Sequence, residues 1–202
     1  MVMGRIVQLP PVRPGVLVWV ISTFTRLPLF SIPLFIAVGV AESGAAGVLW
    51  ALLCLALSGG ASTLYLEYLR RAVRPGDAAR IASGGRLRPL RLIVVQHFLG
   101  WLLVTLLGAP FGLGSLMLAY ALLTVLLAAL TPEEISLHAA GVCAGAVALA
   151  YAFGPWGLAA ALILPPVWWA RTATGRHTPR EVAFGALAGM LAAMICFLLT
   201  GN

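Results

Sequence analysis

The longest apolar stretch of the chain runs from Leu92 to Leu130, which is 39 residues without an arginine, lysine, aspartate or glutamate. A helix that crosses the hydrocarbon core of a bilayer needs about 20 mostly apolar residues, so this stretch is long enough to cross twice. It breaks at residues 108–114, GAPFGLG, where glycine and proline favour a tight turn. The stretch therefore predicts two membrane-spanning helices joined by a short connection.

The rest of the chain is similarly apolar, since 61% of all residues are hydrophobic and only 9% are charged. A soluble domain carries about 25% charged residues. Further apolar runs occupy residues 15–41, 43–66, 135–170 and 182–202. The third of these runs is again about two spans long and breaks at Gly154. In the first run Arg26 and Pro28 predict an interfacial or kinked beginning. We therefore predict an all-α, polytopic transmembrane helical bundle of six or seven spans, with residues 1–202 forming a single domain.

Three polar segments, residues 67–91, 131–138 and 171–181, interrupt the apolar runs. Two predicted spans separate each segment from the next, and an even number of crossings returns the chain to the same side. All three segments are therefore predicted to lie on one membrane face. The positive-inside rule makes that arginine-rich face cytoplasmic, which predicts a multi-pass protein of the plasma (inner) membrane. An anion-binding site would also concentrate arginine there.

The net charge of +7 predicts anionic partners. Nucleic acid is not expected, because the arginines lie between membrane spans. A lipid phosphate held in the bilayer fits both the charge and the hydrophobicity. The small residues of segment 185–189, GALAG, suit close helix packing and would permit a homo-oligomer without requiring one.

The polar segments carry the residue types that phosphoryl transfer by covalent catalysis needs. A histidine nitrogen attacks phosphorus, and a carboxylate on its other nitrogen steadies the imidazolium. A second histidine protonates the leaving oxygen, while arginines neutralise the phosphate oxygens. The chain has only 6 acidic residues and no acidic cluster suited to magnesium, so we expect no metal and no other cofactor.

The third polar segment contains Arg171, then His177 after five intervening residues, then Glu181 after three more. In this spacing the chain resembles the type 2 phosphatidic acid phosphatases, a superfamily of membrane lipid phosphatases. Their third motif is Ser-Arg, five residues, His, three residues, Asp. Here Ala170 replaces the serine and Glu181 replaces the aspartate.

The resemblance extends to the two earlier motifs, but with more departures. The second family motif is Pro-Ser-Gly-His, and here only Ser136 and His138 are kept. The first motif is Lys, six residues, Arg-Pro, and here Arg88 precedes a proline while the lysine position falls on Ile81. Arg80 lies one residue before that position. The resemblance covers roughly residues 67–190, with the motifs in the family's order and two spans between them.

The resemblance implies a metal-independent phosphatase that hydrolyses a lipid phosphate or diphosphate through a phosphohistidine intermediate. The lipid would be a polyprenyl phosphate or diphosphate, or a phosphatidic acid-like lipid. The implied catalytic residues are His177 as nucleophile, His138 as general acid and Glu181 as the partner that orients His177. The implied phosphate-binding residues are Arg88, Arg171 and Ser136, with Arg80 standing in for the missing lysine.

Other interpretations remain open from the sequence. Residues 178–181, TPRE, form a capping box, so Glu181 would cap the last helix with or without orienting His177. His97 matches no motif and is expected to be structural. The same site would also serve a lipid phosphotransferase. From a different class, the arginines would serve a transporter or non-catalytic binder of an anionic lipid.

Overall fold

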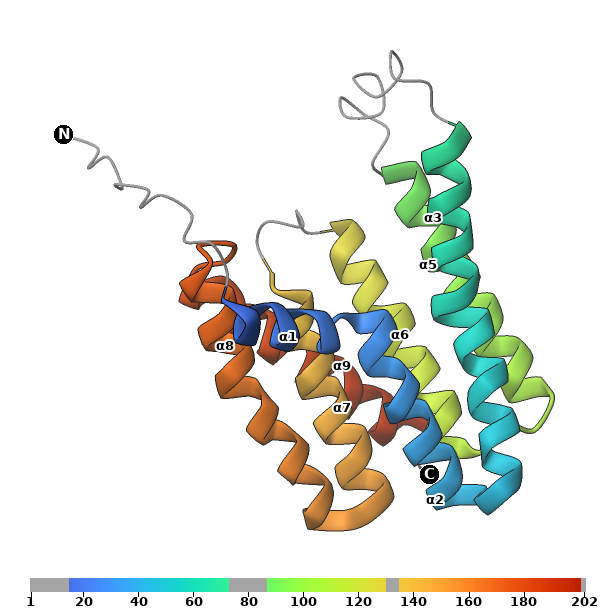
Figure 1. Cartoon of the computed structure of the whole chain (residues 1–202). Coiled ribbons are helices and arrows are strands. Elements are labelled where there is room, and N and C mark those ends of the chain that lie inside the picture. Colours follow the sequence, from blue (N-terminus) through green and yellow to red (C-terminus); the bar gives the residue numbers. More distant parts are fainter. Residues whose placement is uncertain (1–14, 73–86, 130–134, 201–202) are drawn as a thin grey trace, which may run out of the picture.

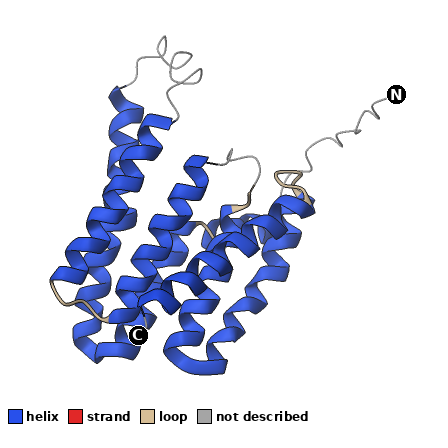
Figure 2. Cartoon of the chain, turned by 180° about the vertical axis from the view of Figure 1, so that it is seen from behind, coloured by secondary structure: helices blue, strands red, loops and turns tan. Residues whose placement is uncertain are grey.

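The structure is a computed structural model of the whole chain and describes residues 15–72, 87–129 and 135–200. Every regular element within these ranges is a helix, which confirms the all-α prediction (Figure 2). Three helical segments are long and apolar enough to cross a membrane: Leu29–Tyr65, Leu137–Ala173 and Pro179–Thr200. Shorter apolar helices cover Arg91–Leu106 and Phe111–Leu126. The total of six or seven spans stays a prediction.

The first apolar run forms two helices that meet at a corner. Helix α1, Val16–Phe24, lies crosswise to the other helices and packs against α8, and α2, Leu27–Leu55, descends from it (Figure 1). Arg26 has an extended backbone and is the N-cap of α2, and a proline follows in the first turn. The arginine and proline that interrupt the run in sequence therefore mark the bend between the two helices.

Helix α2 is itself a hairpin. Ser43 and Gly44 leave the helical conformation, and Gly44 has a φ of 56°, which a residue with a side chain rarely adopts. The two arms approach so closely that a Cβ atom at Gly47 would overlap the Gly39 carbonyl group. The second arm continues through a π-helical turn, Ala56–Gly60, into α3, Ala61–Ala72. The predicted boundary between the first two spans is therefore a real reversal of the chain.

The second half of the chain contains two more hairpins. Helices α5, Leu87–Leu106, and α6, Phe111–Ala129, are joined by a short turn, as the break in the uncharged stretch predicts. Helix α7, Leu137–Phe153, reverses at Gly154 into a 3-10 segment, Gly154–Ile163, which leads into α8, Leu164–Ala173. Helix α9, Pro179–Thr200, closes the described chain.

Small residues let α7 and α9 pack closely, and this contact positions the site. A Cβ atom at Gly185 would overlap the Ser136 backbone, and one at Gly189 would overlap the Ala140 backbone. Such close approach is typical of helices that pack within a membrane. The start of α7, with Ser136 and His138, is therefore held against the first turns of α9. A hydrophobic core beside it joins α2, α5, α6 and α7 and includes Phe35, Val38, Val104, Leu113, Met117 and Ala148.

The helix ends are divided between the two ends of the bundle. The ends of α3, α6 and α8 and the starts of α5, α7 and α9 lie toward the top in Figure 1. The reversals near Gly44, Gly108 and Gly154 lie toward the bottom. The α3–α5 pair nevertheless stands apart from α7, α8 and α9, with α6 between them (Figure 1).

Candidate functional site

The turn between α8 and α9 brings His177 back to the end of α8. Gly175 has a φ of 63°, and its N–H donates to the Thr172 carbonyl at 3.0 Å, which ends α8 in a left-handed turn. The backbone N–H of His177 then donates to the Arg171 carbonyl at 3.3 Å. The five residues between Arg171 and His177 thus form a compact loop that holds the two residues next to each other.

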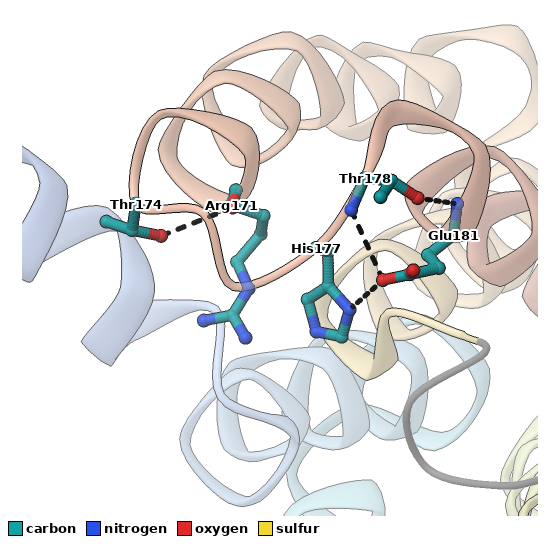
Figure 3. A network of polar contacts seen from close by, with 5 residues as sticks. All are labelled: Arg171, Thr174, His177, Thr178 and Glu181. Atoms are coloured by element: carbon teal, nitrogen blue, oxygen red, sulfur yellow. Dashed lines mark hydrogen bonds and ion pairs between the residues drawn. The ribbon is translucent and has the colours of Figure 1, made fainter. Parts of the chain in front are cut away.

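His177 and Glu181 form a direct pair across one turn. Nδ1 of His177 lies 3.0 Å from Oε2 of Glu181, and the two side chains are only 12% and 27% exposed (Figure 3). A carboxylate only accepts hydrogen bonds, so Nδ1 carries the hydrogen. In the neutral ring Nε2 of His177 then carries the free electron pair that a nucleophile requires.

Glu181 also caps α9. The Thr178 N–H donates to Oε2 of Glu181 at 3.2 Å, and the Glu181 N–H donates to the Thr178 hydroxyl at 3.3 Å (Figure 3). These two bonds form the capping box that the sequence predicts. The two interpretations of Glu181 are therefore not exclusive, since one carboxylate oxygen contacts both the helix start and His177.

Two buried polar groups beside this pair have no hydrogen-bond partner among the described residues. The Arg171 side chain extends beside His177 in Figure 3, is only 7% exposed as a residue, and has an unpartnered Nε. Ser136 is fully buried with an unpartnered hydroxyl, and its N–H donates to the Glu181 carbonyl at 3.1 Å. A buried donor without a partner costs about 1–3 kcal/mol. An anion that accepts from these groups would remove that cost.

His138 joins the same group from α7. Its Nε2 lies 3.1 Å from the Ser22 carbonyl of α1. A carbonyl only accepts, so Nε2 carries the hydrogen and Nδ1 is the nitrogen left for other chemistry. The ionisable side chains whose charges act on the His138 ring are Arg171, His177 and Arg26. His138, at the start of α7, therefore lies close enough to Arg171 and His177 for their charges to act on its ring.

Arg26 is the residue that the sequence interpretation missed. The sequence suggests only that it interrupts the first apolar run, yet its charge acts on both His138 and Arg171. It reaches the site because α1 packs against α8 and the α1–α2 corner lies at the same end of the bundle (Figure 1). Its charge is the sequence feature that could have identified it, because an ionisable residue inside an apolar run is a functional candidate by default.

The start of α5, which carries Arg88 of the predicted first motif, does not lie at this site (Figure 1). Arg88 lies in the first turn of α5, which packs against α6 and α3 and begins well away from the α8–α9 turn (Figure 1). Arg80 lies outside the described residues. His97, expected to be structural, is 4% exposed within α5, and its Nδ1 lies 2.8 Å from the Ile93 carbonyl.

The site is rich in basic groups and poor in acidic ones. Within the described parts of the chain, no group of three or more histidine, cysteine, aspartate or glutamate side chains is arranged to hold a metal ion. Comparisons with known proteins found no matching family model, no matching curated protein and no matching solved structure.

Proposed function

We propose that the protein is a membrane phosphatase that hydrolyses a lipid phosphate or diphosphate through a phosphohistidine at His177. The observation that carries the proposal is the 3.0 Å contact between His177 and Glu181 beside the buried, unpartnered Nε of Arg171. This arrangement combines an oriented nucleophile with a cation placed to hold the oxygens of the phosphate. The resemblance to the type 2 phosphatidic acid phosphatases in the spacing of Arg171, His177 and Glu181 supports the same activity.

In the first step Nε2 of His177 attacks phosphorus. A nitrogen–phosphorus bond forms while the bond from phosphorus to the lipid oxygen breaks. His138 begins this step protonated on both ring nitrogens. Its Nε2–H stays bonded to the Ser22 carbonyl, and its Nδ1 gives a proton to the leaving oxygen. The Glu181 carboxylate stabilises the positive charge that develops on the His177 ring.

In the second step water hydrolyses the phosphohistidine. His138, now without its Nδ1 proton, removes a proton from the attacking water. The nitrogen–phosphorus bond breaks, inorganic phosphate leaves, and His177 returns to its starting state. The reaction therefore needs no external reductant or oxidant, and water is the phosphate acceptor.

Arg26 and Arg171 supply the positive charge in this proposal. In the family pattern a lysine and an arginine of the first motif share that task. Arg26 takes over that task in this proposal, supported by the effect of its charge on His138 and Arg171, whereas the start of α5 lies elsewhere. The distribution of arginine favours a catalytic face on the cytoplasmic side of the plasma (inner) membrane.

The proposed activity is tested with the full chain purified in detergent. We expect phosphate release from phosphatidic acid or from a polyprenyl diphosphate, and we expect the same rate with EDTA present. Release that EDTA abolishes would overturn the mechanism. If neither lipid yields phosphate while both bind, the site belongs to a non-catalytic binder.

A change at Arg26 tests the cation that the structure adds to the site. Arg26→Gln is expected to lower kcat/KM for phosphatidic acid at least tenfold, because a hydrogen bond to a charged group contributes about 1.5–3 kcal/mol. Arg91→Gln, which removes an exposed arginine at the start of the apolar part of α5, is the matched control. Equal kcat/KM values for the two variants would remove Arg26 from the site.

A further inference from the structure

An open apolar groove runs between α6 and α9 and reaches Glu181 of the proposed site. Its volume is about 1070 Å³. One wall comes from the last turns of α6 and includes Leu122 and Leu126, and the other wall is a face of α9 that includes Ala188, Leu191 and Ile195. All of these side chains are hydrocarbon, so the groove suits an apolar chain.

The α9 wall is continuous from the polar end of the bundle into its middle. The positions Glu181, Phe184, Ala188, Leu191 and Ile195 all line the groove and are spaced three or four residues apart, which places them on one helix face. With a rise of 1.5 Å per residue, the wall from the first to the last of them is about 21 Å long. One leaflet of the hydrocarbon core is about 15 Å thick, so the groove is long enough for a lipid tail of that leaflet.

The polar end of the groove is the start of α9. Glu181, which lines the groove there, is the same residue that contacts His177 at 3.0 Å. Arg180 lies at the same end, with its guanidinium 5.5 Å from the centre of the Phe184 ring. A phosphate at this end would therefore meet a cation at the rim of the proposed site.

A second, smaller hollow along α8 makes a useful contrast. It has a volume of about 450 Å³ and includes Pro165, Trp168 and Thr172 in its lining. It therefore lies on the helix that ends at Arg171, but its lining contains no charged residue. The α6–α9 groove is the one that joins an apolar wall to charged groups of the site.

We propose that the α6–α9 groove holds the hydrocarbon tail of the lipid phosphate and makes the enzyme select long tails over short ones. This inference rests on the proposed function, in which the phosphate of the lipid head group is removed at His177. Ala188 is the critical position, because its small side chain leaves the middle of the groove open. A long tail contacts both walls beyond Ala188, whereas a short tail ends before it and gains no such contacts.

A bulky side chain in the groove separates tail binding from chemistry. Ala188→Trp is expected to lower kcat/KM for dipalmitoyl phosphatidic acid at least about tenfold, because the tail loses its place in the pocket. The rate with dihexanoyl phosphatidic acid is expected to stay close to that of the wild type. Leu198→Trp, on the same helix but outside the groove and 70% exposed, is the control and should leave both rates unchanged. An equal effect of Ala188→Trp on both substrates would overturn the inference.

A second measurement does not depend on catalysis. Phosphatidic acid with a photoactivatable diazirine in its tail is expected to label the α9 residues around Leu191 in the wild type, and Ala188→Trp should reduce that labelling severalfold. Labelling without any phosphate release would keep the tail site and reject the phosphatase. Phosphate release without labelling of α6 or α9 would keep the phosphatase and reject the tail site. A change in oligomer size on Ala188→Trp, with unaltered labelling, would assign the groove to a second copy of the chain.

Discussion

Replacement of His177 by alanine is expected to lower the rate of phosphate release at least a thousandfold, because loss of a covalent nucleophile typically costs about 10⁴–10⁶ in kcat. The phosphoprotein intermediate should disappear with the activity. With a radioactive lipid phosphate, the wild type is expected to retain label after an alkaline quench and to lose it in acid, as a phosphohistidine does. His177→Ala should retain no label under either condition.

The chain offers a matched control in its remaining histidine outside the site. His97 is buried in α5 and bonds to the Ile93 carbonyl, so His97→Asn removes an imidazole without touching the proposed chemistry. Its rate should stay close to that of the wild type, with an unchanged elution volume in size-exclusion chromatography. Undiminished phosphate release by His177→Ala, or label that persists in that variant, would refute the assignment of the nucleophile.

The parts of the fold that follow from local composition are predictable from the sequence. The uncharged run from Leu92 to Leu130 predicts the α5–α6 hairpin, because only a turn at the glycine–proline break divides it into two lengths of a membrane helix. The contact between His177 and Glu181 is also predictable from the sequence, but from spacing. Residues four apart around the first turn of a helix face each other.

The arrangement of the helices beside one another is not predictable in this way. The parity of crossings tells which membrane face a segment lies on, but it says nothing about its position within that face. Arg88 illustrates the difference, because the start of α5 lies on the far side of α6 from α8 and α9 (Figure 1). Arg26 illustrates the reverse, because the packing of α1 on α8 and of α2 on α7 brings its charge close enough to act on His138 and Arg171.

The contact of His138 depends on the same packing. Its partner, Ser22, is 116 residues away in the chain. No motif links the two, since the acceptor is a backbone carbonyl that any residue type would supply. The sequence therefore identifies the histidine, while only the structure tells which of its nitrogens is left for a substrate.

The double role of Glu181 gives the second prediction with a large effect. Glu181→Gln keeps an oxygen that accepts from both the Thr178 N–H and Nδ1 of His177, so α9 should remain capped. It removes the negative charge that stabilises the cationic His177 ring in the transition state. We expect kcat to fall about a hundredfold or more, as when a charged partner of a catalytic histidine is neutralised. The thermal unfolding midpoint in detergent should stay close to that of the wild type.

Thr178→Ala removes the other half of the same capping box. The Glu181 N–H loses its acceptor, and loss of an N-cap side chain costs about 1 kcal/mol of stability. The Glu181 carboxylate still contacts His177, so kcat should change little. Glu181→Gln is therefore expected to lower kcat and leave stability unchanged, whereas Thr178→Ala is expected to lower stability and leave kcat nearly unchanged. If Glu181→Gln instead lowers the unfolding midpoint and keeps full activity, Glu181 is a helix cap alone and the His177 ring is oriented by other contacts.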